Sequence, residues 1–305
     1  MKHPTLALLL FASSSISLAQ IPHPSSGTIK RFENFPSRFV AARTIDVWLP
    51  DRYDPKQRYA VVYMHDGQSL FDSTIVWNKQ EWGVDEVLGK LMAAHKIRNC
   101  IVVGVWNTPL RHSEYFPQKP FESLTKSRQD SIFDVNSKGT HPLFKERVQS
   151  DAYLKFLVKE LKPFIDSCFS TRKDRSNTFV AGSSMGGLIS MYAICEYPEV
   201  FGGAACLSTH WPGVFTTEGN PIPAAFMRYL GEHLPSPKNH KLYFDYGTKT
   251  LDASYKPFQQ QADVIIKAKG YTSKNWMTQE FPGADHTERS WNKRLEIPMM
   301  FLLKR

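Results

Sequence analysis

The sequence predicts an α/β fold with a mostly parallel central sheet and helices on both faces. Two observations lead to this class. The runs at 59–65 and 100–105 are apolar enough for strands that are buried on both sides, which is typical of parallel sheets. The segment 84–94 between them has its apolar residues at helical spacing. A strand, a helix and a strand in this order predict a right-handed parallel crossover.

Residues 1–19 have the three regions of a secretory signal peptide: a charged start at Lys2, an apolar run at 5–12 and a small-residue end at 17–19. The apolar run is shorter than the roughly 20 residues that a membrane-spanning helix needs. We therefore expect cleavage after Ala19, a secreted or periplasmic protein and no stable membrane insertion. Nothing that follows reads as a flexible linker, so residues 20–305 are expected to form one domain.

The formal charge of the chain is +9, and it is +8 without the single charge of the signal segment, Lys2. A basic surface can attract anionic substrates or polymers, or it can only aid solubility. No dense run of Lys and Arg accompanies the charge, so we expect no nucleic-acid partner. Of the four cysteines, Cys100 and Cys206 lie in apolar runs and are expected to be buried thiols, and a bridge between Cys168 and Cys195 stays open.

The remaining elements follow in chain order. The segment 37–49 alternates in its second half and ends at Pro50, which predicts an edge strand. The polar segment 106–149 is expected to be a long loop that covers the substrate side, and 208–240 to be a second cap-like insertion. Helices are predicted at 151–169 and 255–269, strands at 201–207, 241–247 and 276–281, and an amphipathic stretch at 290–303.

The segment 177–190 runs from a short apolar strand through a glycine-bracketed serine into a helix. Its residues 182–186, Gly-Ser-Ser-Met-Gly, fit G-x-S-x-G, a strained turn that exposes the serine at the top of a sheet. The turn leaves the backbone N–H of Met185 unpaired at the start of the helix, where negative charge is favoured. Ser184 is therefore a candidate nucleophile and Met185 a candidate oxyanion donor; the alternative is a glycine-rich turn without chemistry.

A second turn, Asp66-Gly67-Gln68, ends the strand at 59–65. Sites in α/β folds lie at the carboxyl ends of central strands, so the backbone N–H of Gln68 is the candidate for the second oxyanion donor. His65 beside this turn could be a base or a metal ligand, but we interpret it as a hydrogen-bonded structural residue.

A serine nucleophile needs a base and a carboxylate that orients the base, and in α/β-hydrolases their order along the chain is Ser, acid, His. His286 follows the last predicted strand on a glycine-containing loop, and Asp252 lies just beyond the preceding strand. We therefore predict His286 as the base and Asp252 as the acid. The competing carboxylates lie inside a strand, inside a helix or beside the histidine: Asp245, Asp263 and Asp285.

Four short motifs carry a resemblance to a known family: 182–187, 65–68, 111–115 and 283–286. Together they resemble the "Putative esterase" family of α/β-hydrolases, which is related to esterase D and includes feruloyl and acetyl xylan esterases, enterobactin esterases and mycolyltransferases. The resemblance extends from about Phe39 to Leu303. It implies an α/β-hydrolase fold and a carboxylic ester hydrolase with Ser184, His286 and Asp252 as catalytic triad. It also implies oxyanion donors at Met185 and Gln68, with no cofactor and no metal.

The presence of Asp252 favours the polysaccharide-ester branch of that family, with a feruloyl or acetyl ester as substrate and small-molecule or polysaccharide-linked esters as the expected partners. Substrate contacts are expected from residues of the two insertions: Arg111, Glu114, Tyr115, His210 and Trp211. Simple packing is the alternative for Trp211. A siderophore trilactone esterase, an acyltransferase and a carbohydrate-binding degenerate hydrolase stay open as alternatives, and the sequence does not indicate the oligomeric state.

Overall fold

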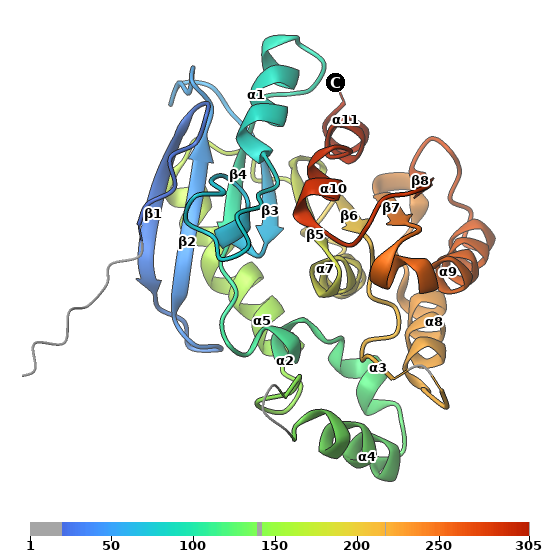
Figure 1. The fold of residues 1–305 in the computed structure, drawn as a ribbon. Helices are drawn as coiled ribbons and strands as arrows, with labels where there is room; N and C mark the ends of the chain where they lie inside the picture. The colour runs from blue at the N-terminus through green and yellow to red at the C-terminus, as the bar shows by residue number, and fades with distance from the viewer. Residues whose placement is uncertain (1–19, 139–141, 217, 305) are drawn as a thin grey trace, which may run out of the picture.

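The computed structural model describes residues 20–138, 142–216 and 218–304, so the expected signal peptide at 1–19 lies outside the described residues. The described chain folds around a twisted central sheet with helices on both sides (Figure 1). The strand order is β1-β2-β4-β3-β5-β6-β7-β8. The strands are β1 (Thr28–Phe35), β2 (Arg43–Leu49), β3 (Ala60–His65), β4 (Cys100–Val105), β5 (Thr178–Ser183), β6 (Gly203–Leu207), β7 (Lys241–Gly247) and β8 (Trp276–Phe281).

The sheet is parallel from β4 to β8, and β2 runs antiparallel to both β4 and β1. The prediction of an edge strand at 37–49 was wrong, because β1 pairs with the outer side of β2. The segment of β1 is rich in polar residues, and its side chains are only half-buried or exposed. Its apolar face is carried by Phe32 and Phe35, which pack edge-on against Phe164 with ring centroids 4.9 and 5.0 Å away.

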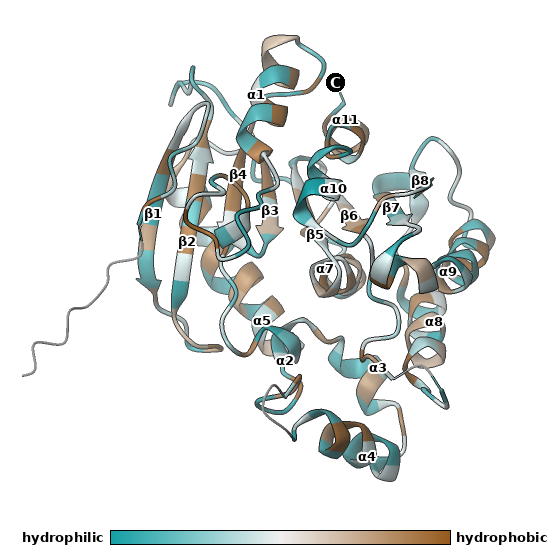
Figure 2. Ribbon diagram, viewed as in Figure 1, coloured by the Kyte–Doolittle hydropathy of each residue, from teal (hydrophilic) through white to brown (hydrophobic). Residues whose placement is uncertain are grey.

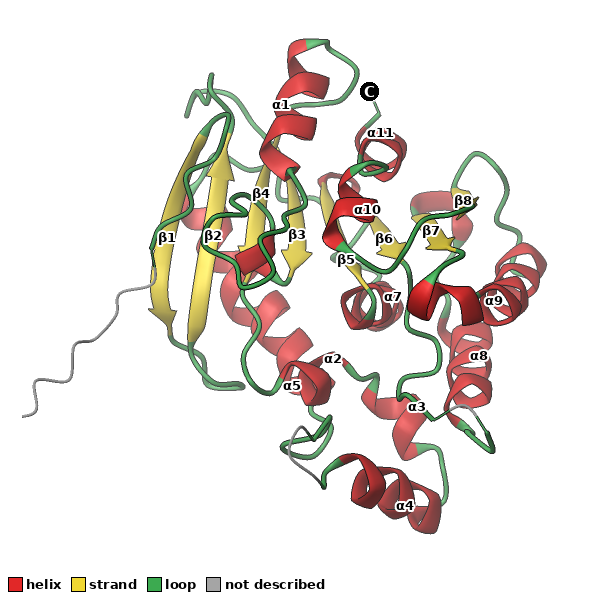
Figure 3. Cartoon of the chain, viewed as in Figure 1, coloured by secondary structure: helices red, strands yellow, loops and turns green. Residues whose placement is uncertain are grey.

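The helices fill the crossovers and the two insertions (Figure 3). They are α1 (Val84–Ala93), α2 (Arg111–Tyr115), α3 (Gln118–Glu122), α4 (Lys126–Asn136), α5 (Ser150–Lys155), α6 (Lys162–Cys168), α7 (Met185–Glu196), α8 (Ile222–His233), α9 (Lys256–Ala268), α10 (Glu288–Asn292) and α11 (Glu296–Leu303). One stretch of π-helix, Phe156–Leu161, joins α5 to α6, so the helix predicted at 151–169 is continuous but not uniform.

Two layers of core cover the two faces of the sheet. Successive residues of a strand point to opposite faces, so Val61 and Tyr63 join the layer under α5, α7, α8 and α9, while Val62 and Met64 join the layer under α1 and α11. All six residues of β3 and of β4 are buried. Figure 2 shows hydrophobic residues along these two strands, as expected of strands covered on both faces.

The segment 106–149 was predicted to be a loop, but it contains α2, α3 and α4, which lie beyond the arrowhead of β3 (Figure 3). Its aromatic residues supply the packing that a structureless loop would lack. The Phe116 ring packs against Phe226 of α8 at 5.4 Å and against Phe144 at 5.3 Å. The two insertions are thus held together by an aromatic cluster and extend the core.

All four cysteines of the described chain are free thiols. Cys100 and Cys206 are buried, which confirms the prediction for this pair. The open possibility of a bridge between Cys168 and Cys195 is not realised, and Cys168 lies exposed while Cys195 is buried. Across the described ranges, none of the helices has the length and apolar character needed to cross a membrane.

Candidate active site

Ser184 stands on a sharp turn between β5 and α7, as the glycine pattern predicted. Its backbone dihedral angles are φ 58° and ψ −121°, and residues other than glycine rarely adopt such a positive φ. The turn is possible because Gly182 and Gly186 touch: a Cβ atom on Gly182 would lie 2.8 Å from the carbonyl carbon of Gly186. The strained backbone therefore holds the Ser184 side chain at the carboxyl end of the central strands.

The two candidate oxyanion donors have free backbone N–H groups. Met185 is the first residue of α7, and the N–H of Ser184 before it is already bound to the carbonyl oxygen of Leu207 at 2.9 Å. Asp66 turns the chain with φ 58°, and Gln68 follows it in a short 3₁₀ turn. None of the hydrogen bonds within the described residues uses the N–H of Met185 or Gln68, so both remain available for an anionic oxygen.

Asp252 and His286 form a direct hydrogen bond, with 2.5 Å between Oδ1 of the carboxylate and Nδ1 of the ring. Asp252 follows β7 and His286 follows β8, so the pair bridges two neighbouring strand ends. The loops are tied together, because the N–H of His286 donates to the Thr250 hydroxyl at 2.9 Å. The structure thus brings these two predicted residues together, and none of the described hydrogen bonds uses Nε2 of the ring.

The second oxygen of Asp252 is held from two sides. Oδ2 accepts hydrogen bonds from the backbone N–H of Gly247 at 2.5 Å and from the Ser208 hydroxyl at 2.6 Å. Burial by itself raises the pKa of Asp252, but the bonds from His286, Ser208 and Gly247 outweigh burial and lower the pKa below its usual value. The carboxylate is therefore ionised and fixed.

Asp245, the competing acid, is occupied elsewhere. Its carboxylate accepts two hydrogen bonds from the Arg294 guanidinium, at 2.9 and 3.1 Å, and both side chains are buried. Arg294 also donates to the Ser208 hydroxyl at 2.9 Å. Asp245 is thus connected to Asp252 only indirectly, through Arg294 and Ser208. It has no hydrogen bond to a histidine within the described chain.

Ser184 and His286 line one cavity of about 490 Å³. The described hydrogen bonds include none between the Ser184 hydroxyl and the His286 ring; such bonds are often long before substrate binds. The rest of the lining is rich in amide and indole side chains. It comprises Asp66, Gln68, Ser69, Trp77, Asn78, Gln80, Trp82, Asn107, Arg111, Ser183, Thr287, Glu288 and Trp291.

Of the residues predicted for substrate contact, Arg111 lines this cavity. Its guanidinium donates two hydrogen bonds to the Asp66 carboxylate, at 2.6 and 2.8 Å, so the two charges neutralise each other at the cavity. Burial by itself raises the pKa of Asp66, but the neighbouring Arg111 outweighs burial and lowers the pKa. His65 beside this pair is buried and bonded through Nδ1 to the Tyr153 hydroxyl at 2.8 Å, and burial lowers its pKa to about 3, which confirms the structural interpretation.

The other four predicted contact residues are buried parts of the core and lie outside the cavity lining. Glu114 is fully buried and paired with Arg43 through two hydrogen bonds, at 2.6 and 3.0 Å. Tyr115 is fully buried as well. His210 bonds through Nδ1 to the Tyr255 hydroxyl at 2.6 Å, and the Trp211 indole donates to Gln259 at 2.9 Å. Their polar groups are satisfied inside the protein, so the packing alternative holds for Trp211.

Most of the lining residues that sequence reasoning missed come from the loop 77–82 and from the start of α10, residues 287–291. The indole of Trp77 is 93% exposed at the cavity, whereas Trp82 and Trp291 are buried and stack on each other at 5.3 Å. The sequence did contain a signal, because two tryptophans, Trp77 and Trp82, with amide side chains between them lie on the segment that follows the turn at 66–68. Within the described ranges, no cluster of three or more His, Cys, Asp and Glu side chains could hold a metal ion.

The sequence matches the model of a known protein family over most of its length. The family model described as "Putative esterase" matches residues 37–299. A Bacillus subtilis relative, described as uncharacterized protein YjcH, is 26% identical over 179 residues, which cover 59% of this chain and 60% of the relative. The chain thus spans less than two thirds of that relative.

Two further proteins are similar. An endo-1,4-β-xylanase/feruloyl esterase of Xylanibacter ruminicola is 24% identical over 269 residues, 86% of this chain and 29% of that protein. The structure of a CE1 ferulic acid esterase from Anaeromyces mucronatus, in complex with ferulic acid, has a TM-score of 0.60 at 18% identity and covers 90% of this chain and 91% of that one. This structural likeness shows a shared fold.

Proposed function

The chain belongs to the "Putative esterase" family and has the α/β-hydrolase fold, and from this premise we propose that it is a serine carboxylic ester hydrolase that works through an acyl-enzyme. The observation that carries the proposal is the bond from His286 Nδ1 to Asp252, which turns Nε2 toward the cavity that Ser184 also lines. A base that is oriented by a carboxylate beside a strained, exposed serine is the arrangement that acyl transfer requires.

In the proposed mechanism, Nε2 of His286 takes the hydroxyl proton of Ser184 as the Oγ atom attacks the ester carbonyl carbon. The carbonyl oxygen becomes negatively charged and is held by the N–H groups of Met185 and Gln68. The protonated His286 then gives its proton to the departing alcohol, and the acyl group stays on Ser184. Water repeats the cycle: His286 deprotonates the water, which attacks the acyl-enzyme, and the acid leaves as the proton returns to Ser184.

Asp252 keeps the His286 ring in the tautomer whose Nδ1 carries the proton, and its negative charge stabilises the imidazolium that forms during each half of the reaction. Its lowered pKa supports this role, because the carboxylate is then charged throughout the range in which esterases work. Arg111 and Asp66 neutralise each other, so the described lining of the cavity contains no Arg or Lys without an acidic partner.

The cavity lining favours a neutral, hydrogen-bonding substrate, and we propose a carbohydrate-linked ester with a feruloyl or acetyl group. The amide side chains of Asn78, Gln80 and Asn107 offer donors and acceptors of the kind that sugar hydroxyls bind, and the exposed face of Trp77 offers a flat apolar surface for an aromatic acyl group or a sugar ring. A highly anionic iron chelate would meet Glu288 and the neutralised Arg111 here, so the cavity does not favour it.

We also propose that the enzyme acts outside the cytoplasm. The support is the signal-peptide pattern at residues 1–19, and the proposal includes residues 20–305 as one catalytic domain with insertions at 106–149 and 208–240. The extracellular location would bring the enzyme to polymeric esters that do not enter cells.

The experiment that tests the function is a substrate panel with purified wild type and Ser184→Ala. Acetyl, feruloyl and longer-chain aryl esters are supplied, the released acid is followed directly, and acetylated and feruloylated oligosaccharides are compared with the same acyl groups on simple alcohols. We expect release that depends on Ser184 and is faster from the oligosaccharide esters. Absence of any Ser184-dependent release would overturn the hydrolase proposal. Transfer of the acyl group to added alcohol in preference to water would replace it with an acyltransferase.

A further inference from the structure

The edge of the sheet opposite to Ser184 carries a row of positively charged side chains. The parallel strands begin at this edge, and most of them begin at or just after a basic residue. These residues are Arg58 before β3, Arg98 before β4, Arg172 and Arg175 before β5, Lys238 and Lys241 at β7, and Lys274 before β8. We call this group the basic edge.

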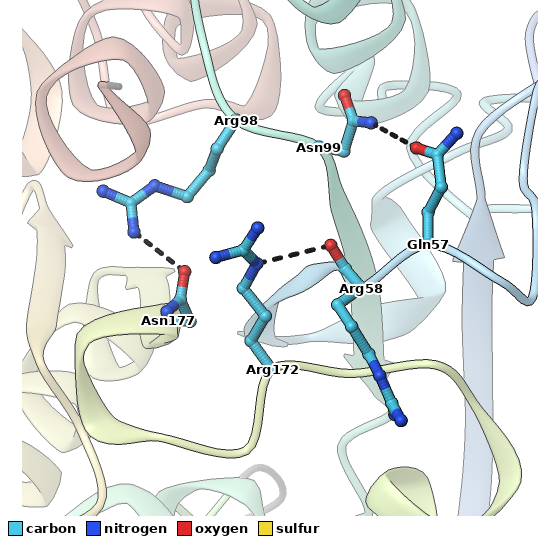
Figure 4. A pocket seen from close by; sticks show the side chains of 6 residues that line it. All are labelled: Gln57, Arg58, Arg98, Asn99, Arg172 and Asn177. Carbon is cyan, nitrogen blue, oxygen red and sulfur yellow. Dashed lines mark hydrogen bonds between the residues drawn. The ribbon is translucent and has the colours of Figure 1, made fainter.

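Two neighbouring hollows open along the basic edge. The first has a volume of about 540 Å³ and is lined by Gln57, Arg58, Arg98, Asn99, Arg172 and Asn177 (Figure 4). The second has a volume of about 710 Å³ and shares Arg98 with the first. Its other charged lining residues are Asp174, Arg175, Lys238, Lys241 and Lys274. The two hollows together form a groove in which cations greatly outnumber the single carboxylate.

No cation of the basic edge has a carboxylate oxygen within 4.0 Å in the part of the chain that the structure describes. Asp174, the acid of the groove, is instead bonded to the side chains of Ser176 and Asn177. The positive charges therefore repel one another without direct compensation, which costs folding free energy unless an anion binds.

Arg98 is the fixed centre of this charge. Its guanidinium is half-buried and bonded to neutral acceptors, among them the Asn177 side chain at 2.9 Å and the Lys304 carbonyl oxygen at 2.9 Å. Burial lowers the pKa of Arg98 and the charge of Arg172 lowers it further, while the Asp174 carboxylate offsets only part of this effect. Burial also lowers the pKa of Lys241, and Arg98 adds to that effect. Both pKa values are thus lowered, as expected when several positive charges lie close enough to interact.

Arg172 and Arg58 are two arginines of the basic edge that keep free hydrogen-bond donors within the described structure. In Figure 4 the end of the Arg172 side chain lies between Arg98 and Asn177 on one side and Arg58 on the other, and its only side-chain bond within the described residues runs from Nε to the Arg58 carbonyl oxygen at 3.4 Å. The Arg58 guanidinium makes no hydrogen bond to a described residue. A guanidinium with free donors forms paired hydrogen bonds to the oxygens of carboxylate, sulfate or phosphate groups.

We propose that the basic edge binds oxyanion groups, with Arg172 and Arg58 as direct donors and Arg98 as a fixed positive charge, and that an acidic polysaccharide carries these groups. The charges are spread over two adjoining hollows, which favours a polymer with repeated charges. The rings among its described lining residues, Phe179 and His240, are buried, so these residues offer no exposed ring on which nucleic-acid bases could stack. A polymer held here leaves the cavity at Ser184 open and raises the local concentration of the substrate that it carries.

The test measures binding of polygalacturonate to wild type, to the double variant Arg58→Gln with Arg172→Gln, and to a matched double variant, Arg128→Gln with Lys267→Gln. The matched variant removes the same charge from exposed positions on α4 and α9. Calorimetric titrations are run at low salt and at about 0.5 M salt, where exposed charges are screened. Inorganic phosphate and monomeric galacturonate serve as separate ligands, and thermal unfolding checks that each variant folds.

We expect wild type and the matched variant to bind polygalacturonate at low salt, and the Arg58/Arg172 variant to bind at least about tenfold more weakly. Saturable binding of phosphate or monomeric galacturonate would place the recognition in single oxyanions, and binding of the polymer alone would place it along the whole groove. Equal binding by all three proteins would overturn the proposal. Tighter binding of a single-stranded oligonucleotide of the same charge would overturn the polysaccharide assignment. None of these outcomes depends on esterase activity.

Discussion

The Ser208 hydroxyl donates a 2.6 Å hydrogen bond to Oδ2 of Asp252, the oxygen that does not contact His286. The same hydroxyl accepts hydrogen bonds from the Trp291 indole and from Arg294, each at 2.9 Å. Ser208 therefore has its one proton committed to Asp252 and both acceptor positions filled. It connects the candidate catalytic acid to the buried ion pair of Arg294 and Asp245.

Ser208→Ala should lower kcat roughly ten- to hundredfold, because a hydrogen bond to a charged group contributes about 1.5–3 kcal/mol. Loss of this bond also raises the pKa of Asp252, so the acid limb of the pH–rate profile should move toward neutral pH. Steady-state rates across pH check both effects. Ser113→Ala is the control, since that buried hydroxyl bonds to the Glu146 carbonyl oxygen away from the cavity. Equal losses in both variants would mean that Ser208 acts only on stability.

Replacement of the two aspartates should separate catalysis from stability. Asp252→Asn should lower kcat on the order of 10⁴-fold, because the amide favours the wrong His286 tautomer. Asp245→Asn should instead destabilise the fold by about 3–5 kcal/mol, because it leaves the buried Arg294 charge without its partner, with a much smaller effect on kcat. Denaturant unfolding and steady-state kinetics on both variants give the two readouts. The reverse pattern would make Asp245 the acid.

Gly182→Ala should destroy activity, because its Cβ atom would lie 2.8 Å from the Gly186 carbonyl carbon and force the Ser184 turn open. Gly231→Ala in α8 is the matched control: its new Cβ atom would have Ile265 as its nearest neighbour at 3.8 Å, an ordinary contact. The control should keep full activity and gain up to about 1 kcal/mol of stability from helix propensity. Labelling of Ser184 by a fluorophosphonate reports the state of the turn. An active Gly182→Ala enzyme would contradict the proposed geometry.

Trp77→Ala should raise KM for feruloylated oligosaccharides roughly two- to tenfold while kcat on simple acetyl esters stays unchanged. The 93% exposed indole contributes nothing to the core, so its removal should leave the melting temperature unchanged. An aromatic contact is worth about 0.5–1.5 kcal/mol, which sets the expected size. Trp77→Phe should restore most of the affinity. If KM stays at the wild-type value in Trp77→Ala, the substrate binds elsewhere along the cavity.

Acid should lower the free energy of unfolding in a pH window set by three histidines whose pKa values are well below the usual value. Burial lowers the pKa of His65, His112 and His210 to about 3 each, so they are neutral in the folded state. In the unfolded chain these histidines take up protons below a pH of about 6.5, whereas in the folded protein they stay neutral. The protein therefore has its full free energy of unfolding above that pH and loses part of it as the pH falls toward 3. Within this window, each histidine should lower the free energy of unfolding by roughly 1 kcal/mol for each pH unit of acidification.

Denaturant titrations of wild type and His65→Gln between neutral pH and about pH 4 check this prediction. As the pH falls, the free energy of unfolding of the variant should decrease less steeply than that of wild type, because the unfolded variant binds one proton fewer. A contribution from lowered carboxyl pKa values, such as that of Asp252, belongs to a separate and more acidic window. Identical slopes for the two proteins would show that His65 takes up a proton in the folded state.

The α/β class, the buried central strands and the turn around Ser184 could be predicted from the sequence, because each depends on a local pattern. Apolar runs define strands that are covered on both faces, and glycine at 182 and 186 has a local steric reason. The order of Ser184, Asp252 and His286 along the chain was equally local, since each residue follows a predicted strand. Strand β1 was missed because its half-exposed pattern gives no apolar run.

The surroundings of the site depended on contacts between segments far apart in the sequence. Glu114 and Arg43 are 71 residues apart, and only the folded sheet shows that they neutralise each other in the interior. The cavity lining from 77–82 and 287–291, and the link from Asp245 through Arg294 and Ser208 to Asp252, have the same origin. Local sequence determines backbone conformation and burial pattern, whereas the partner of each polar side chain is decided by which strand ends the tertiary fold brings together.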